Sequence, residues 1–354
     1  MSFDEILKLR GRIDRINQQL LDLFTERADL VRQIGEIKIQ NGLEKFDPLR
    51  EAEEVDAVLA ANTGPFSDGT IRHLFTEIFR ASLDLMTQQQ TQVLRVSRKH
   101  KSDDTVFAID DVSFGGPEPV VMAGPCAVET EDQVRRVAAR LAELGVKVLR
   151  GGAFKPRSSP YAFQGLGRKG YEILARVARE FGLITVSEVM DTEAIGMTAD
   201  LVDILQIGAR NMSNFKLLEA VRDAGKPVLL KRGLAATYEE LLLAAEYVIA
   251  GTEKIILCER GIRTFEPWTR NTLDIAAVPI LRMHSHLPVV VDVSHAAGRT
   301  DILVPLARAA LAAGANGLMV EVHPAPAFAL SDQNQQLDLD AFGEFMAQVF
   351  PSQP

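Results

Sequence analysis

The stretch VLLKRG, residues 228–233, is a short apolar run that ends in two cations and a glycine. A run of this length, closed by a turn-forming residue, is typical of a buried strand in a parallel sheet. Amphipathic helical stretches separate it from similar runs, so the chain alternates strand and helix patterns. The other runs are residues 120–124, 147–152, 184–189, 204–208, 255–261, 289–295 and 317–323.

The number and spacing of these units distinguish between two α/β folds. Eight strand–helix units in about 250 residues are the number and length of a TIM barrel. A doubly wound open sheet is the alternative, but the even spacing and the lack of a G-x-G-x-x-G turn favour the barrel. We therefore predict an α/β fold with a (β/α)8 TIM barrel over residues 93–354.

Charged or metal-binding side chains follow nearly every predicted strand. In a barrel the carboxyl ends of the strands meet at one face, where the active site lies. One strand-end cation alone is most often a surface charge. Six or more cations at one face of a chain with net charge −9 instead predict a funnel for phosphates or carboxylates. The strand-end residues are Cys126, Arg150, Lys155, Arg157, Glu188, Arg210, Lys231, Arg260, Asp292, His295 and Glu321.

The second strand continues into LRGGAFKPRSSPYAFQG, residues 149–165. This segment holds Arg150, Lys155 and Arg157 within eight positions, among glycines and prolines that prevent a regular helix. A solvated charged run normally mixes both signs, whereas this one is entirely positive. An ordinary basic turn is the alternative to our prediction, which is a rigid loop that holds its cations over the barrel mouth.

Four residues supply a mixed set of metal-binding groups: Cys126, His295, Glu321 and Asp332. One soft, one borderline and two hard ligands suit a divalent transition metal that keeps positions open for substrate. The spacing matches no short zinc signature. Cys126 as a small buried hydrophobe, His295 as a hydrogen-bonded barrel histidine and Asp332 as a loop cap remain alternatives.

The first 92 residues have a helical pattern. Apolar residues recur in steps of three and four from Ile6 to Ile37, which predicts one helix with a coiled-coil seam over residues 3–40. Because such a helix is about 55 Å long, we expect it to pack against a second copy of the chain.

Two further helices are predicted over residues 48–61, which Asp47-Pro48 would begin, and over about 70–90. The polar stretches 86–92 and 97–104 are predicted to be a linker, with the domain boundary near residue 92. An all-α domain over residues 1–92 would thus precede the barrel.

Composition excludes several classes of protein. The net charge of −9 argues against binding to nucleic acid or anionic lipid, and two cysteines are too few for a disulfide framework. There is neither an apolar run of about 18 residues nor a signal-peptide pattern at the N-terminus. We expect a soluble, cytoplasmic protein with no membrane partner.

Six motifs of the barrel portion resemble those of the 3-deoxy-D-arabino-heptulosonate 7-phosphate (DAHP) synthases, in the branch shared with the KDO-phosphate synthases. The motifs are AGPCAVE, LRGGAFKPRSSPYAFQG, QIGARNM, LLKRG, DVSHAAGR and MVEVHPAP. Ser158 stands in the Ser/Thr position of the K-P-R-[ST]-S loop, where the KDO-phosphate branch has an Asn-containing loop. The resemblance therefore implies erythrose 4-phosphate, rather than arabinose 5-phosphate, as the aldehyde that condenses with phosphoenolpyruvate at the start of the shikimate pathway.

The same resemblance implies a role for each strand-end residue. Cys126, His295, Glu321 and Asp332 would bind one divalent metal ion (manganese, iron, cobalt or zinc), which would act as a Lewis acid on the aldehyde oxygen. Lys155, Arg157 and Ser158 would face the aldose phosphate, and Lys155, Glu188, Asp292 and His295 would be catalytic. The phosphate and carboxylate of phosphoenolpyruvate would be held by Arg150, Lys155, Arg210, Lys231 and Arg260.

Residues 3–90 resemble the all-α chorismate mutases. Arg27 falls on the apolar stripe, where a charge is costly unless it is paired, and Lys38 lies about 16 Å along the same face. Arg10 is about 25 Å from Arg27, so it would have to reach the site from a partner chain. The resemblance implies a chorismate or prephenate site shared between subunits of a dimer of dimers. Its residues would be Arg10, Arg27, Lys38, Asp47, Arg50, Glu51 and Ser82.

Met86 departs from the mutase pattern, which has Gln or Glu at this position to hydrogen-bond the ether oxygen of the breaking bond. A thioether has no donor. We therefore predict weak or absent mutase activity and a domain that senses chorismate or prephenate and inhibits the barrel. The alternatives are a bifunctional enzyme with an active mutase, a domain that serves only dimerisation, and a non-catalytic metabolite-binding protein.

Overall fold

The computed structural model describes residues 3–40, 48–89, 93–155 and 161–351. Within these ranges, the side chains of residues 39–40, 48–49 and 83–89 are not described. The chain forms two compact units, residues 1–92 and 93–354. Each unit is considered by itself below.

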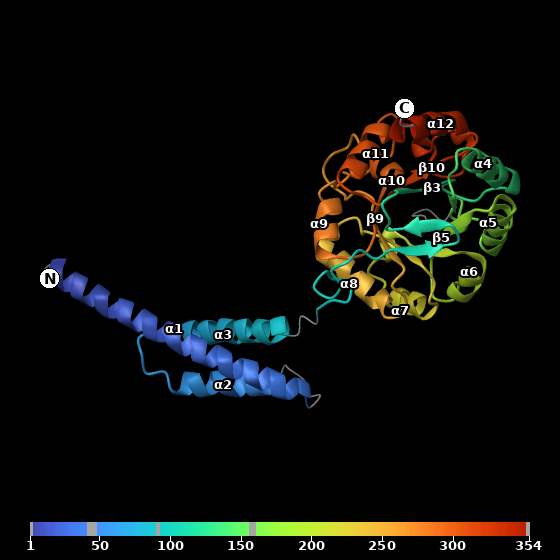
Figure 1. Cartoon of the computed structure of the whole chain (residues 1–354). Helices are drawn as coiled ribbons and strands as arrows, with labels where there is room; N and C mark the ends of the chain where they lie inside the picture. Colours follow the sequence, from blue (N-terminus) through green and yellow to red (C-terminus); the bar gives the residue numbers. More distant parts are fainter. Residues whose placement is uncertain (1–2, 41–47, 90–92, 156–160, 352–354) are drawn as a thin grey trace. The chain divides into compact units, whose positions relative to one another are not determined.

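The first unit contains three helices, α1 (Phe3–Gln40), α2 (Pro48–Ala60) and α3 (Asp68–Gln89) (Figure 1). The helices predicted over 3–40, 48–61 and 70–90 are confirmed to within two residues. Both α1 and α2 pack against α3. Only a few apolar side chains are buried between them, whereas the seam of α1 stays exposed at Ile6, Leu9, Ile13, Ile16, Leu20, Leu23, Leu30, Ile34 and Ile37.

The second unit is a closed barrel of eight parallel strands, which confirms the predicted fold. Neighbouring strands in chain order pair with each other, and the last strand pairs with the first to close the barrel. The strands are β3 (Val120–Gly124), β4 (Val148–Arg150), β5 (Ile184–Val189), β6 (Ile204–Ile207), β7 (Val228–Lys231), β8 (Ile255–Glu259), β9 (Val289–Asp292) and β10 (Gly317–Glu321).

Helices surround the strands as a ring (Figure 1). They cover the barrel with apolar faces, and the strands themselves are almost entirely buried. Among the described residues, every helix is too short or too polar to cross a lipid bilayer. The helices of this unit are α4 (Glu131–Glu143), α5 (Arg168–Phe181), α6 (Ile195–Leu201), α7 (Phe215–Asp223), α8 (Tyr238–Ile249), α9 (Ala277–His284), α10 (Val293–Ala297), α11 (Leu303–Ala312) and α12 (Leu339–Val349), with short 3₁₀ helices η1 (Ala209–Asn211), η2 (Pro326–Phe328) and η3 (Gln333–Gln335).

A two-stranded hairpin that the sequence analysis did not predict closes one end of the barrel. It consists of β1 (Phe107–Ile109) and β2 (Val112–Phe114), which pair in antiparallel fashion. Its apolar side chains cluster with Val148, Ile184 and Ile204, the first residues of their strands. The hairpin therefore lies at the N-terminal end of the barrel, and the C-terminal end is left for a site.

The predicted linker over residues 97–104 is wrong, because this stretch is bound to the barrel. The backbone N–H of Arg98 donates to the backbone oxygen of His284 at 3.0 Å, and Arg98 Nε donates to that of Arg282 at 2.7 Å. Directly before the stretch, Val96 is fully buried, and Glu246 of α8 accepts hydrogen bonds from the backbone N–H groups of Arg95 (3.0 Å) and Val96 (3.1 Å). Arg98 pairs with Asp104 within the stretch, whereas Lys101 pairs with Glu253 at 3.4 Å, in the segment before β8. Residues 86–89, also predicted as linker, belong to α3.

The contact between Glu246 and the chain start of the barrel unit should contribute to stability. Glu246→Ala leaves two backbone donors without their partner, so we expect the free energy of unfolding of the barrel to fall by about 1–3 kcal/mol. Glu239→Ala is the matched control on the exposed face of α8, with a change below about 0.5 kcal/mol. Urea unfolding of both variants measures the difference, and equal values would contradict the anchoring role.

Candidate functional site

A cavity of about 250 Å³ opens at the C-terminal end of the barrel. Because the barrel is closed, residues from β4, from the strands after it and from the segment after β10 lie around one cavity. Seven cations line this cavity, together with one carboxylate from β5 and the edge of a metal-binding cluster. The cations are Arg150, Lys155, Arg210, Lys231, Arg260, Arg263 and Arg270.

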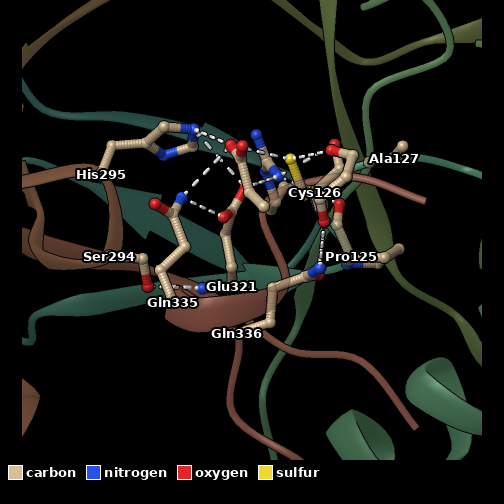
Figure 2. A network of polar contacts seen from close by, with 12 residues as sticks. Pro125, Cys126, Ala127, Ser294, His295, Glu321, Gln335 and Gln336 are labelled. Atoms are coloured by element: carbon tan, nitrogen blue, oxygen red, sulfur yellow. Dashed lines mark hydrogen bonds and ion pairs between the residues drawn. The ribbon is translucent and has the colours of Figure 1, made fainter. Parts of the chain in front are cut away.

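Beside the cavity lies a cluster of four metal-binding groups (Figure 2). One ligand atom from each of Cys126, His295, Glu321 and Asp332 lies within 4.8 Å of all the others. Glu321 ends β10, Cys126 follows β3, His295 lies in α10 directly after β9, and Asp332 lies in the segment that follows β10. Asp332 adopts a left-handed backbone conformation (φ 47°), which is unfavourable for a non-glycine residue and is maintained by its surroundings.

Asp292 orients the imidazole of His295. Burial lowers the pKa of His295 to about 4, so the ring is neutral. Its Nδ1–H donates to Asp292 Oδ2 at 2.8 Å, while Nε2 lies 3.5 Å from Glu321 and 3.8 Å from Asp332. The lone pair of Nε2 therefore faces the cluster, as a histidine ligand requires. Burial would raise the pKa of Asp292, but the adjacent His295 and Lys231 outweigh it and hold that pKa well below its usual range.

Cys126 is a buried thiol whose pKa is raised to about 12 by burial and by the charge of Glu321. Its Sγ lies 3.3 Å from Asp332 Oδ2 and accepts a hydrogen bond from the Ser331 hydroxyl at 2.7 Å. Two carboxylates, a neutral imidazole and a thiol that can lose its proton form a donor set that fits a divalent cation. The cluster therefore has the chemistry of a metal site.

Ion pairs hold most of the buried charges in place. Arg150 contacts Glu321 at 2.7 Å, Arg270 contacts Asp332 at 2.9 Å, and Lys231 pairs with Asp292. Burial would raise the pKa of Asp332, but the charge of Arg270 and its hydrogen bond keep that pKa below its usual value. These pairs join the cavity to the metal-binding cluster, because in each the cation lines the cavity and the anion belongs to the cluster or touches it.

Arg260 differs from these cations. Its Nη1 is buried and has no hydrogen-bond partner among the described residues, and burial lowers its pKa. A buried charge without a partner is costly, so this guanidinium favours an anion in the cavity that it lines.

The carboxylate of Glu188 also lines the cavity and requires a glycine beside it. A Cβ at Gly208 would lie 1.9 Å from Glu188 Oε1. Across the cavity, Lys155 Nζ donates to the backbone oxygen of Cys126 at 2.9 Å. A carboxylate and an ammonium group thus face the same space, where they can exchange protons with a bound molecule.

The structure brings together every predicted barrel residue that it describes: Cys126, Arg150, Lys155, Glu188, Arg210, Lys231, Arg260, Asp292, His295, Glu321 and Asp332. Arg157 and Ser158 lie outside the described residues. Sequence reasoning missed Arg263, Arg270 and Asn271, which follow β8 and line the cavity. The signal was there, since RGIRTFEPWTRN (260–271) is another almost wholly positive segment with a proline after a strand.

In the helical unit, Arg27 and Ser82 are in contact. Arg27 Nη1 donates to Ser82 Oγ, and its guanidinium lies over the ring of Phe79, 5.3 Å from the centroid. Both line a mostly apolar hollow of about 430 Å³ between α1 and α3. Arg27, on the apolar stripe, is thus hydrogen-bonded to Ser82. Among the described residues, it is the cation that lines this hollow.

The other predicted regulatory residues lie elsewhere. Arg10 is exposed on α1, Lys38 is near the C-terminal end of the same helix, and Arg50 forms an ion pair with Glu54 at 3.1 Å on α2, which also carries Glu51. Asp47 and the side chain of Met86 lie outside the described part of the chain.

Comparison with known proteins identifies two family domains in the chain. Residues 87–352 match the DAHP synthetase I family, and residues 9–87 match chorismate mutase type II. Phospho-2-dehydro-3-deoxyheptonate aldolase of Thermotoga maritima is 54% identical over 255 residues, which are 72% of this chain and 75% of that protein. A 2-dehydro-3-deoxyphosphooctonate aldolase of Acidithiobacillus ferrooxidans is 36% identical over 231 residues, covering 60% of this chain and 81% of the relative.

Solved structures give the same result. The crystal structure of the Thermotoga maritima DAHP synthase has a TM-score of 0.70 at 54% identity and covers 72% of this chain and 74% of that one. A truncated form of 3-deoxy-D-arabino-heptulosonate 7-phosphate synthase from the same organism has a TM-score of 0.67 at 50% identity, over 72% of this chain and 93% of that one. The resemblance inferred from the motifs is confirmed: the chain is an enzyme of the DAHP synthetase I family that carries an N-terminal chorismate mutase type II domain.

Proposed function

We propose that the barrel condenses phosphoenolpyruvate with erythrose 4-phosphate and water to give DAHP and inorganic phosphate. The observation that carries this proposal is the cavity lined by seven cations beside a four-group metal-binding cluster. Two phosphorylated substrates repel each other in water, and a cationic cavity both offsets that repulsion and aligns them.

Phosphoenolpyruvate fits five of the seven cations that line the cavity. Arg260 has a buried guanidinium nitrogen without a partner, and Arg210 and Lys231 line the same cavity. These three groups would take the phosphate, and Arg150 and Lys155 would take the carboxylate. The loop that contains Arg157 and Ser158, with Arg263 at the exposed edge, would then take the phosphate of the aldose.

A divalent cation fits the cluster of Cys126, His295, Glu321 and Asp332. Bound there, it would supply Lewis-acid polarisation of the aldehyde oxygen. Manganese, iron, cobalt and zinc all suit this donor set, so the residues do not favour one metal over another.

The remaining chemistry falls to residues of the chain itself. Carbon 3 of phosphoenolpyruvate forms the new bond to the aldehyde carbon, water adds to carbon 2, and the bond between carbon 2 and the phosphate oxygen breaks. Glu188 would accept the proton of the attacking water, and Lys155 would donate a proton to the aldehyde oxygen as it becomes a hydroxyl. Asp292 would hold His295 and Lys231 in position throughout.

For the helical domain we propose binding of chorismate or prephenate, with inhibition of the barrel as the consequence. Arg27, held by Ser82 at an apolar hollow, supplies a cation for a small dicarboxylate. Two copies of the chain, packed along the exposed seam of α1, would complete the site with Arg10 of the second copy and would form half of a dimer of dimers. Met86 has no hydrogen-bond donor where the mutase pattern has Gln or Glu, which argues for a sensor rather than a fast mutase.

Arg260→Met tests the anion site. The substitution removes a buried guanidinium whose Nη1 has no hydrogen-bond partner among the described residues. We therefore expect the KM for phosphoenolpyruvate to rise roughly 10–100-fold. The melting temperature of the metal-free chain should not fall, because Nη1 has no hydrogen-bond partner to lose and the substitution relieves the cost of a buried charge. Arg299→Met, whose guanidinium pairs with Asp301 outside the cavity, is the control. Equal KM values in the two variants would show that Arg260 does not bind phosphoenolpyruvate.

Metal removal tests the cluster. We expect a chelator to abolish consumption of phosphoenolpyruvate and added manganese to restore it. Cys126→Ala should need far more manganese for half-maximal rate, because one of four ligands is gone, whereas Cys258→Ala, in the barrel interior, should respond as the unaltered chain does. Full activity of the chelated enzyme would contradict metal dependence.

Deletion of residues 1–92 tests the sensor. The barrel unit has its own core, so we expect the shortened chain to fold and to consume phosphoenolpyruvate, but without inhibition by prephenate. Rates with and without prephenate, measured for both chains, make the comparison. If the barrel alone were inhibited as strongly as the full chain, the helical domain would not be the sensor.

A further inference from the structure

Each group of the metal-binding cluster is held by a residue outside the cluster. Asp292 holds His295, Ser331 contacts Cys126, and Arg150 pairs with Glu321. Gln335, in η3, differs from these, because its side chain contacts two groups of the cluster (Figure 2). The family resemblance assigns no role to Gln335.

The three contacts of Gln335 use both ends of its amide. Nε2 donates to Glu321 Oε2 and lies 3.4 Å from Asp332 Oδ2. Oε1 accepts from Arg270 Nη1 at 2.6 Å. Arg270 itself pairs with Asp332, so these residues form a closed ring of contacts.

The chemistry of the partners allows only one orientation of this amide. Carboxylates only accept hydrogen bonds and a guanidinium only donates them, so Nε2 has to face Glu321 and Oε1 has to face Arg270. Gln335 is also 2% exposed, so bulk water does not compete for either contact. The side chain is therefore fixed between the two carboxylates.

This placement holds the Glu321 carboxylate at both of its oxygens. Glu321 Oε2 is occupied by Gln335, while Oε1 lies 3.5 Å from His295 Nε2 and 2.7 Å from Arg150. The donated N–H groups also reduce the repulsion between two carboxylates that lie within 4.8 Å of each other before any cation arrives. Without Gln335, Glu321 would lose the donor at its Oε2, and Asp332 would lose one of the groups that contact it.

We propose that Gln335 is a positioning residue that sets the affinity of the cluster for its divalent metal. The proposal rests on the metal site of the proposed function. Residues that orient metal ligands in this way typically change metal affinity by about 10–100-fold when they are replaced. Gln335 would act through Glu321 and Asp332, without touching metal or substrate.

The test compares two substitutions in the same 3₁₀ helix of the full chain. Gln335→Met keeps the volume of the side chain and removes the amide. Gln333→Met is the matched control, because the Gln333 amide bonds only to the Ala329 backbone oxygen (2.8 Å) in the described structure. Metal-free protein is titrated with manganese to obtain Kd, and with cobalt to record the absorption bands that report ligand geometry.

We expect Gln335→Met to weaken manganese binding about 10-fold or more and to shift the cobalt bands, while Gln333→Met matches the unaltered chain. Unchanged Kd and cobalt bands in Gln335→Met would overturn the proposal. If the unaltered chain bound no manganese, the proposed metal site itself would be wrong, which is a separate outcome.

A second variant covers the case in which Gln335→Met fails to fold, as judged from the melting temperature of the metal-free chain. Gln335→Asn keeps the amide but is one methylene shorter, so it cannot reach Glu321 and Arg270 together. Weaker manganese binding with an unchanged melting temperature supports the positioning role. Manganese binding equal to that of the unaltered chain contradicts it.

Discussion

The pairing of β10 with β3 is the constraint on which the rest of the structure depends. It closes eight parallel strands into a barrel, so residues as far apart in the chain as Cys126 and Asp332 meet at one rim. The hairpin of β1 and β2 fills the opposite end with apolar side chains. The polar groups of the interior therefore gather at the C-terminal end, where substrates can reach them.

Burying so many charges at one rim is possible because most of them are paired. Arg150 with Glu321, Lys231 with Asp292 and Arg270 with Asp332 each combine a cavity cation with an anion in or beside the metal-binding cluster. In the proposed function, an anionic substrate and a divalent cation would both bind to members of these pairs. The two binding events would then be electrostatically linked, because a cation in the cluster would neutralise the carboxylates that pair with the cations of the cavity.

Much of this was predictable from the sequence, and the reasons for the rest are physical. The strands were recognisable because each is a short apolar run, and Arg150, Lys231 and Glu321 because each ends one. The hairpin was missed because its strands have only three residues each. The segment 97–104 was misassigned because its polarity does not reveal its anchoring to Arg282 and His284. Gln335 gives no sequence signal, since its role depends on contacts that exist only in the folded loop.

The most direct test of this account is the loss of phosphoenolpyruvate absorbance by the metal-stripped full chain, with erythrose 4-phosphate and manganese added singly and together. The account predicts loss only when both are present, and a much slower loss when arabinose 5-phosphate replaces erythrose 4-phosphate. No loss with any divalent metal, or an equal loss without the aldose, would contradict the central claim that this rim joins two phosphorylated substrates beside a metal.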